Sequence, residues 1–401
     1  MPFSPTKIAK LTLKRFRSVP AETVDLSNPL FLVGKNGAGK SNLVDALAFL
    51  SECTTQPIQA AFDKRGGISA VRYRPGPKSL PGNFGLRADF GQAGCGFHGS
   101  YAFELRALPN YGFEVAREQC IVKPTDQPGM RFDRKRSEFH TNVSGIQPSV
   151  DPQALVLPVV GGSSAFAPAL KLLSSLRVYS IEPTQVRELQ DPDSGQSLKS
   201  DGSNAASVLK NLPQNGAGLG LERLCEIFTT IVPGTTAIRT KKHGKKLSLE
   251  FTQDWGECKH VNFEAFAMSD GALRALGILT AIWQRPIPSV VAIEEPESTI
   301  HPEALGAILD VIRIAASRTQ VVLTTHSPEV LDARWIGPTN VRVVTWERGV
   351  TRVLPLGTAP VQAIQRHLMG AGELFRSNAL DPDEAQSPAG GAVQDADLFA
   401  E

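Results

Sequence analysis

The sequence predicts an α/β fold with a mixed central sheet, an antiparallel β subdomain and an inserted helical and β lid. Three observations carry this prediction. An apolar run over 30–34 enters a glycine-rich turn and is followed by helical spacing over 41–53. Alternating residues over about 83–140 are typical of antiparallel strands. Residues 269–347 alternate between helical and apolar strand patterns, as chains that form parallel sheets do.

These patterns divide the chain into four parts. Residues 1–145 and 261–375 are expected to form the two halves of the body. Residues 146–260 are richer in helical patterns and include a predicted hairpin, so we interpret them as an inserted subdomain. Residues 376–401 are acidic and rich in Pro, Gly, Ala and Gln, and we expect a disordered tail.

The composition limits the class of protein. The 401 residues are 41% apolar, enough for a sizeable core, and the net charge of +2 gives no global argument for nucleic-acid binding. The five cysteines form no C-x-x-C pair, which is typical of a reduced protein without a disulfide framework or zinc site. The N-terminus lacks a signal-peptide pattern, and no apolar stretch approaches about 20 residues. We therefore expect a cytoplasmic protein with no membrane segment.

Gly34–Ser41 (GKNGAGKS) matches the pattern G-x-x-x-x-G-K-[ST] in full and lies between the apolar strand and the helix. Its glycines let successive backbone N–H groups point at phosphates, and the helix N-terminus adds partial positive charge. We expect Lys40 to reach the β- and γ-phosphates and Ser41 to ligate Mg²⁺. A plain glycine-rich turn is the alternative, and the strand–turn–helix context disfavours it.

A second apolar strand, 290–293, ends in Glu294 and Glu295. Buried carboxylates are costly unless they are paired or bind a metal, so two at one strand end indicate a cation site. Glu294 is expected to hold Mg²⁺, and Glu295 to polarise the attacking water as general base. The alternative is a solvated strand end with acidic residues.

Two further motifs lie nearby in the sequence. Residues 320–325 form an apolar strand that ends at His326, which is placed to contact a γ-phosphate or the attacking water. Ser269 and Asp270 precede an apolar helix and are good N-cap candidates. The same helix N-terminus could present N–H groups to a γ-phosphate held by another subunit.

Together the motifs resemble ABC-type ATPases of the RecF, SMC and overcoming-lysogenization group, also described as AAA-family ATPases. The shared order is phosphate loop, long insertion, Ser-Asp-Gly, Glu-Glu-Pro-Glu and Thr-Thr-His-Ser, and the opening LTLKRFRSV is similar to that group's first strand. The likeness is strongest to an uncharacterised subgroup of bacterial predicted ATPases and covers roughly residues 6–375.

The resemblance implies a P-loop NTPase head that binds ATP and Mg²⁺, hydrolyses ATP and closes as a homodimer. By position, it assigns catalysis to Lys40, Glu295 and His326, and the metal to Ser41 and Glu294. Ser269 and Gly271 match signature residues that contact ATP on the partner subunit, and 298–301 match a loop that crosses the dimer interface. The implied nucleotide contacts are Gly34, Asn36, Gly37, Ala38, Gly39, Lys40, Ser41, Asn42, Ser269 and Gly271.

The sequence departs from the family pattern in three places. The metal carboxylate is Glu294 where transporters and SMC proteins usually have Asp, so turnover could be slow. The signature has Asp270 where transporters have Gly. For the glutamine that normally ligates Mg²⁺, Gln56 and Gln59 are only weak candidates.

The resemblance favours a role on DNA, in repair or in defence against phage or plasmids. Basic residues bind phosphate backbones without sequence preference. Two clusters qualify, although both could be plain solvated loops: Lys241, Lys242, Lys245 and Lys246, and Arg131, Arg134, Lys135 and Arg136.

Other functions remain open at this point. The chain could be a regulatory ATPase that holds a separate nuclease or toxin, or an ABC transporter ATPase, against which the long insertion argues. The end of the tail, with Gln394, Leu398 and Phe399, is also similar to peptides that dock bacterial sliding clamps, although the Gln lies one position too far from the pair.

Overall fold

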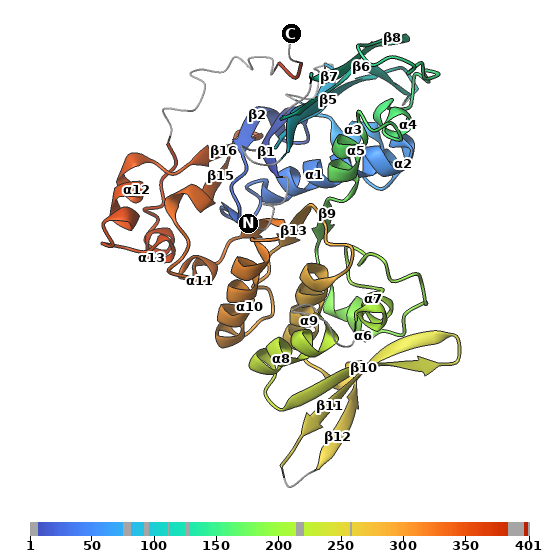
Figure 1. The fold of residues 1–401 in the computed structure, drawn as a ribbon. Coiled ribbons are helices and arrows are strands. Elements are labelled where there is room, and N and C mark those ends of the chain that lie inside the picture. Colours follow the sequence, from blue (N-terminus) through green and yellow to red (C-terminus); the bar gives the residue numbers. More distant parts are fainter. Residues whose placement is uncertain are drawn as a thin grey trace. The chain divides into compact units, whose positions relative to one another are not determined.

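The structure is a computed structural model, and it divides into two compact units (Figure 1). The first unit contains residues 1–177, 339–361 and 380–401, and the second contains 178–338 and 362–379. Each unit is therefore assembled from segments that are far apart in the sequence. The residues described are 7–74, 82–91, 96–110, 112–125, 128–213, 220–256, 259–383 and 397–399.

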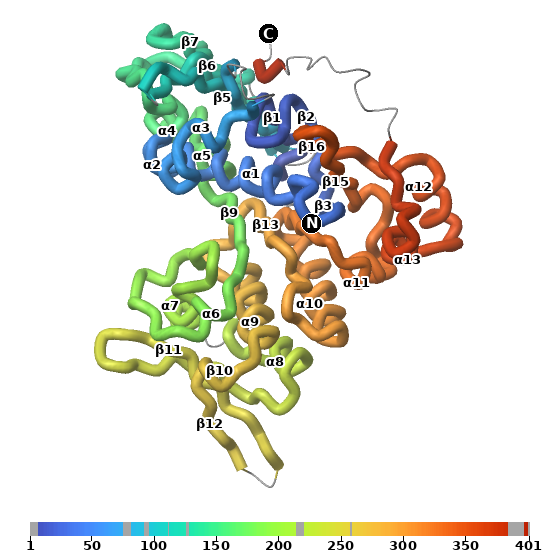
Figure 2. The backbone as a smooth tube through the Cα atoms, turned by 180° about the vertical axis from the view of Figure 1, so that it is seen from behind, coloured from blue at the N-terminus to red at the C-terminus, as the bar shows by residue number. Residues whose placement is uncertain are grey.

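An antiparallel sheet in the order β2-β1-β4-β5-β6-β7-β8 forms much of the first unit, and Figure 2 follows it from behind. Alternation places one face inward: Leu11 and Leu13 on β1 pair with Ala88 and Leu86 on β4, and all four are buried. The predicted antiparallel subdomain is confirmed. Its strands are β1 (Ile8–Phe16), β2 (Val19–Asp25), β4 (Phe84–Phe90), β5 (Phe97–Ala107), β6 (Phe113–Pro124), β7 (Met130–Lys135) and β8 (Glu138–Thr141).

Helix α1 (Lys40–Thr55) packs against the buried face of this sheet through aromatic side chains. The ring centroid of Phe49 lies 5.7 Å from that of Phe16, 5.5 Å from Phe62 and 6.3 Å from Phe103. Such ring pairs add stabilisation beyond the area that they bury. The other helices of this unit are short: α2 (Ile58–Asp63), α3 (Ile68–Val71), α4 (Leu157–Val160) and α5 (Ala167–Ser174).

Arg65 and the two glycines after it have a structural explanation. The Arg65 guanidinium pairs with Asp45 at 2.8 Å and also with Glu52, both on α1, and lies 5.2 Å from the Phe49 ring centroid. The chain then turns through left-handed φ values of 79° at Gly66 and 96° at Gly67, which glycine adopts without steric cost. This segment therefore fixes the outer face of α1.

Three further strands of the first unit have the order β16-β15-β3. They are β3 (Leu30–Val33), β15 (Val341–Glu347) and β16 (Val350–Pro355). Strand β15 is parallel to β3 and antiparallel to β16, so the sheet is mixed, as predicted. Helix α12 (Thr358–Gln365) follows β16 in the chain.

In the second unit, strand order is β14-β13-β9, with β9 (Arg177–Tyr179), β13 (Val290–Glu294) and β14 (Gln320–Thr325). The pair β13–β14 is parallel and aligns Glu294 with Thr324, so both strands end at the same edge. The larger helices here are α9 (Asp270–Trp283) and α10 (Pro302–Ala315). The shorter ones are α6 (Pro183–Arg187), α7 (Ala205–Asn211), α8 (Leu221–Ile231), α11 (Pro328–Leu331) and α13 (Ala371–Arg376).

A three-stranded sheet, β10-β11-β12, completes the second unit. It contains β10 (Thr235–His243), β11 (Lys246–Asp254) and β12 (His260–Glu264). The predicted basic hairpin is confirmed, because His243 pairs with Lys246 across the turn. The third strand, β12, is short and was not predicted.

The end of the chain differs from the tail that the sequence led us to expect. Leu398 and Phe399 are buried beside Ala102 of β5. This pair therefore lies against the chain's own sheet in this structure, and docking on a sliding clamp stays a prediction. Gln394 lies outside the described residues.

Candidate functional site

The phosphate loop connects β3 to α1, and the neighbouring strands β15 and β16 explain two of its glycines. A Cβ on Gly34 would lie 2.3 Å from the Val344 carbonyl oxygen. Gly39 has a φ of 99°, and its Cβ would lie 2.2 Å from Thr351 Oγ1. Side chains at these positions would push the loop away from the sheet. The loop therefore needs glycine for packing as well as for phosphate access.

Lys40 is buried, and its ammonium spans the loop. Its Nζ donates hydrogen bonds to the carbonyl oxygens of Gly34, at 2.8 Å, and Lys35, at 3.1 Å. Residues 35–37 and Ser41 are exposed around it. No side chain of the described residues caps the N-terminus of α1. A curled loop with an ammonium and uncapped helix N–H groups fits a polyphosphate, and the exposed Ser41 hydroxyl fits a Mg²⁺ ligand.

A brace of hydroxyl groups holds the loop from behind, and sequence analysis missed it. Thr351 Oγ1 donates to the Ala38 carbonyl at 3.0 Å and lies 2.6 Å from Ser18 Oγ. Asn42, which was predicted to contact nucleotide, donates its amide to Ser18 Oγ at 2.5 Å. Asn42 therefore contacts the brace in this structure. The three positions are far apart in sequence, so no local pattern could reveal the brace.

In the second unit, the chain turns sharply after Glu294 at the end of β13. Glu295 has a left-handed φ of 44°, which is uncommon for a residue with a side chain. Its N–H donates to the Thr324 carbonyl at 3.1 Å, and its own carbonyl accepts from Arg274 Nη1 at 3.1 Å. Backbone strain held in place by such contacts occurs often at functional sites.

The turn presents the Glu295 carboxylate to His326. Glu295 Oε1 lies 3.1 Å from His326 Nδ1, and both side chains are 39% exposed. Glu297 holds the backbone next to this pair. Its carboxylate accepts from Thr325 Oγ1 at 2.7 Å and from the His326 N–H at 3.3 Å. A water-accessible carboxylate beside an imidazole can accept and pass on a proton.

The predicted signature begins α9 as expected. Ser269 is the N-cap, and its Oγ accepts from the Ala272 N–H at 3.3 Å. A Cβ on Gly271 would lie 2.6 Å from the Thr299 carbonyl oxygen, so the glycine permits close approach of the loop that follows the carboxylates. Arg187 of α6 binds Asp270 at 2.5 Å and the Met268 carbonyl at 3.0 Å. Arg187 supports the signature and Arg274 joins α9 to the Glu295 carbonyl, and sequence analysis missed both contacts.

The two weak glutamine candidates lie at the wrong end of α1. The helix has 16 residues, so Gln56 at its C-cap is roughly 24 Å from the phosphate loop. Gln59 donates to Asp63. Neither can reach a metal held by Ser41, so both assignments need correction.

The predicted residues therefore fall into two groups. The first unit contains the phosphate loop with Lys40 and Ser41. The second unit brings together Glu294, Glu295 and His326, and holds the signature on α9.

Two families of ATPase domains match these segments. The family described as "AAA domain" matches residues 10–72, which include the phosphate loop. The family described as "AAA domain, putative AbiEii toxin, Type IV TA system" matches residues 259–332, which include the signature, both carboxylates and His326.

Among curated proteins, the DNA replication and repair protein RecF of Francisella tularensis is 44% identical over 45 residues, in subspecies novicida, tularensis and holarctica. The match covers 11% of this chain and spans only 13% of the length of these relatives.

Solved SMC heads match almost the whole chain at low identity. An Smc head bound to the C-terminal winged-helix domain of ScpA has a TM-score of 0.56 at 16% identity, covering 88% of this chain and 99% of its own. The Pyrococcus furiosus Smc head bound to the C-terminal domain of ScpA has a TM-score of 0.54 at 15% identity, covering 90% and 99%. The Pyrococcus yayanosii Smc head has a TM-score of 0.53 at 11% identity, and the match covers 91% of this chain and 100% of that head. In its two motif segments the chain is similar to AAA ATPase domains. Its fold is the α/β SMC-head fold with a mixed sheet and an antiparallel β subdomain.

One of the predicted DNA contacts is wrong. Arg134 is 0% exposed, and its guanidinium donates to the carbonyl oxygens of Asp151, Ala154 and Arg136. It therefore cannot meet a phosphate backbone. Arg131 pairs with Asp133 on its own strand, whereas Lys135 and Arg136 are exposed.

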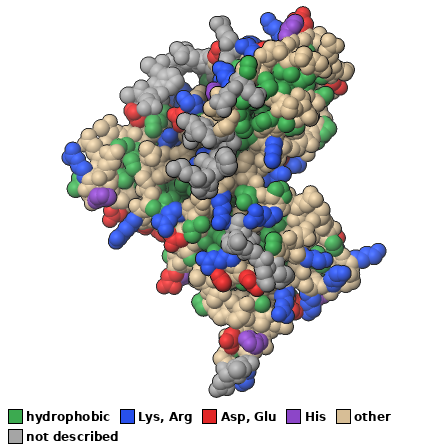
Figure 3. Space-filling model, viewed as in Figure 1, with side chains coloured by type: hydrophobic (Ala, Val, Ile, Leu, Met, Phe, Trp, Pro, Cys, Tyr) green, Lys and Arg blue, Asp and Glu red, His purple; other side chains and the backbone are tan. Residues whose placement is uncertain are grey.

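Part of the positive charge of the β10–β11 hairpin is paired within the chain and part is exposed. Lys241 pairs with Glu264 at 2.8 Å, and Lys246 pairs with Asp191 at 2.7 Å. Lys242 and Lys245 are exposed at the tip. Figure 3 shows Lys and Arg side chains gathered over β10 and β11 on the viewed face.

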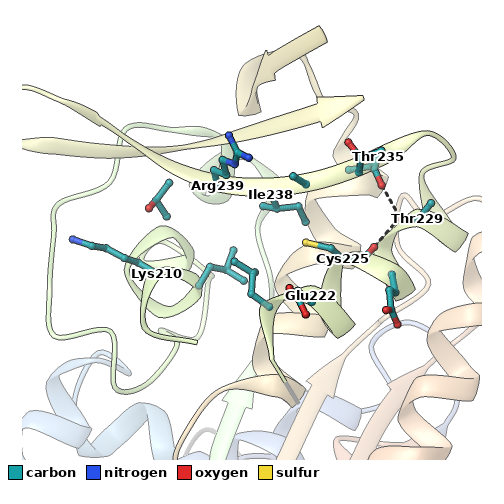
Figure 4. Close-up of a pocket in the computed structure, with 13 residues that line it drawn as sticks. Lys210, Glu222, Cys225, Thr229, Thr235, Ile238 and Arg239 are labelled. Atoms are coloured by element: carbon teal, nitrogen blue, oxygen red, sulfur yellow. Dashed lines mark hydrogen bonds between the residues drawn. The ribbon is translucent and has the colours of Figure 1, made fainter. Parts of the chain in front are cut away.

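A pocket of 760 Å³ opens between α7, α8 and β10 (Figure 4). Lys210, Glu222 and Cys225 line it, and Thr229 closes one side by donating to the Thr235 carbonyl at 2.6 Å. Of the described residues that line it, none belongs to the predicted ATP site. Among the described residues, no helix is both long and apolar enough to cross a membrane.

Proposed function

We propose that this chain binds ATP with Mg²⁺ and hydrolyses it, and that hydrolysis resets a conformational switch. The observation that carries the proposal is the exposed Glu295–His326 pair, 3.1 Å apart, at the carboxyl edge of β13 and β14. The buried Lys40 within a glycine loop supports it, as does the match of both motif segments to ATPase families.

On this proposal, the loop N–H groups and Lys40 bind the phosphates, and Ser41 and Glu294 hold the metal. Bound Mg²⁺ would neutralise charge that develops on the phosphate oxygens. Glu294 ends β13 in register with Thr324, at the edge where Glu295 and His326 follow the two strands.

Glu295 is assigned as the general base. Its backbone is held by Thr324 and Arg274, so its carboxylate is presented without side-chain rearrangement. His326 is assigned to orient the water or contact the γ-phosphate. The neighbouring Glu297 holds the backbone of His326 and thereby limits the positions that the imidazole can adopt.

Glu295→Gln tests the chemical step. The variant should bind ATP with unchanged affinity and lose hydrolysis by about 100-fold or more, because only the base is removed. Nucleotide binding would be followed by a fluorescent ATP analogue, and turnover by phosphate release. Glu303→Gln, on an exposed position of α10, is the matched control and should keep turnover. Unchanged turnover in Glu295→Gln would remove Glu295 from the mechanism.

We further propose that the switch acts on DNA, in repair or in defence against mobile elements. The support is the similarity to RecF, together with the exposed Lys242 and Lys245. A separate effector chain is the alternative partner, and the match to a toxin–antitoxin family favours testing it by co-purification.

Reversing two charges tests the DNA proposal. Lys242→Glu with Lys245→Glu should weaken duplex binding and lower the salt slope by about 1 per lost phosphate contact. Fluorescence anisotropy across a salt series measures both. Lys171→Glu, an exposed lysine on α5, is the control. Equal affinities and slopes for the two proteins would exclude the hairpin as the DNA surface.

A further inference from the structure

The last described residues of the chain, Asp397–Phe399, lie against the outer face of the antiparallel sheet in the first unit. Leu398 is 1% exposed and Phe399 is 7% exposed, and with Ala102 they form an apolar cluster of their own. In both views of the backbone, the C-terminal segment lies beside this sheet (Figures 1 and 2). A chain end that carries two exposed apolar side chains would be costly in water, so this burial stabilises the contact.

Two small residues make the hole that Leu398 fills. Ala102 of β5 pairs with Arg87 of β4, and Gly85 lies two positions before Arg87 on the same face. A Cβ on Gly85 would lie 2.6 Å from Leu398 Cδ1. Gly85 has no side chain and Ala102 has only a methyl group. Together they leave a space that fits a branched apolar side chain.

Two arginines recognise the rest of the segment. Arg87 Nη1 donates to the Leu398 carbonyl at 3.1 Å, while Asp89 holds the same guanidinium at 2.7 Å. The Arg117 guanidinium lies 4.1 Å from the ring centroid of Phe399, a cation–π distance. The Phe399 N–H donates to Asp397 Oδ1 at 3.0 Å, which fixes the turn of the peptide. The sheet thus contacts the side chain and carbonyl of Leu398 and the ring of Phe399.

Charge also favours this occupant. The C-terminal segment, QDADLFAE, carries acids on both sides of its Leu-Phe pair, and the two residues that meet it are arginines. Tethering within one chain keeps a short peptide at an effective concentration on the order of millimolar. A peptide with only modest intrinsic affinity therefore remains docked.

We propose that the outer face of β4–β6, around Gly85 and Ala102, is a docking site for acidic peptides that contain Leu-Phe. Its resident occupant is this chain's own C-terminal segment, bound in cis. The site is independent of the ATP residues, and a free peptide of the same chemistry competes for it.

A labelled peptide of sequence QDADLFAE tests the site on the full chain. The double variant Leu398→Asp/Phe399→Asp vacates the site and should bind the peptide at least tenfold more tightly than wild type, whose own segment competes. In that background, Ala102→Leu fills the hole and should abolish binding, and Arg117→Ala should weaken it severalfold. Lys171→Ala, at an exposed position of α5, is the control and should bind normally. Equal binding by wild type and the double variant would overturn the proposal.

Timed carboxypeptidase digestion provides a second readout that needs no variant to fold. In wild type, mass spectrometry should show removal of residues 400–401 and then a pause at Phe399, because its side chain is buried. Addition of excess free peptide should remove the pause. Uninterrupted digestion past Leu398 in wild type would contradict docking. Wild type could instead be a dimer without nucleotide, and the double variant a monomer. That result would contradict docking within one chain and would show that the segment binds a second copy. ATP turnover should be the same in all these variants, so a failure here leaves the ATPase proposal standing.

Discussion

At the scale of single residues, Glu118 of β6 and Arg134 of β7 belong to a buried polar network. Glu118 accepts from Tyr101 Oη at 2.9 Å and from the N–H groups of Val156 and Leu157 at 2.7 and 2.9 Å. Arg134 Nη1 lies 3.7 Å from the carboxylate. Burial raises the pKa of Glu118 and lowers that of Arg134, because both charged forms lose solvation.

Removal of the guanidinium should therefore affect folding rather than binding. Arg134→Ala leaves the Glu118 carboxylate and three carbonyl oxygens without their partner, at a cost of about 3–5 kcal/mol in unfolding free energy. Urea denaturation measures it. Arg136→Ala, two residues away and 68% exposed, should stay within about 0.5 kcal/mol of wild type. Similar stabilities for the two variants would show that the buried network contributes little.

Single residues also show what sequence reasoning could find. The roles proposed for Lys40, Ser41, Glu294 and Glu295 follow from short motifs. All residues of such a motif lie within a few positions of one another in the sequence. Arg134 was misjudged because a run of basic residues does not reveal which face of a strand each one occupies. In β7, Arg134 points inward while Lys135 points to solvent.

At the scale of elements, the ion pair between Glu22 and Arg352 joins β2 to β16, 3.2 Å apart. The next residue before Arg352 is Thr351, whose hydroxyl braces the phosphate loop. Burial outweighs the arginine and raises the pKa of Glu22 from its ordinary 4.5 to about 7. The strand contact that supports the loop is thus sensitive to protonation near neutral pH.

The raised pKa predicts a pH dependence of stability. Because the folded state holds the Glu22 proton more tightly than the unfolded chain, its contribution is full below about 4.5 and declines as pH rises to about 7. The decline is about 3 kcal/mol, at about 1.4 kcal/mol per pKa unit. Glu22→Gln should flatten this part of the stability curve in urea titrations between these pH values. An identical slope in the variant would assign the pH dependence to another group.

The elements that the sequence predicted share a strong local repeat of apolar residues. The strands of the antiparallel subdomain, helix α1 and the β10–β11 hairpin belong to this class, and the structure contains all of them. The five-residue β12 was missed because its pairing depends on β11, not on its own pattern. The hydroxyl brace and the Leu398 cluster were missed for the same reason: Ser18 contacts Thr351, and Ala102 contacts Leu398, across most of the chain.

At the scale of the whole molecule, the proposed signature is assigned to a contact with a second subunit. Ser269 and Gly271 begin α9 in the second unit, and their side of the helix is fixed by Arg187 and by the Thr299 backbone. A helix N-terminus held rigidly in this way is suited to contact a phosphate. If the contact is made in trans, ATP binding and dimerisation are one equilibrium, and each partner supplies half of each site.

Subunit mixing tests this directly. Ser269→Arg and Glu295→Gln should each abolish turnover as homodimers. Mixed before ATP is added, they form heterodimers in which the Ser269→Arg subunit keeps its own Glu295 and meets an intact Ser269 from its partner. Because one site in such a heterodimer is complete, turnover should recover to about a quarter of wild type when subunits assort randomly. Light scattering with ATP would confirm the dimer mass. If the signature acts within its own chain, both sites stay defective, and the mixture remains as inactive as either variant alone.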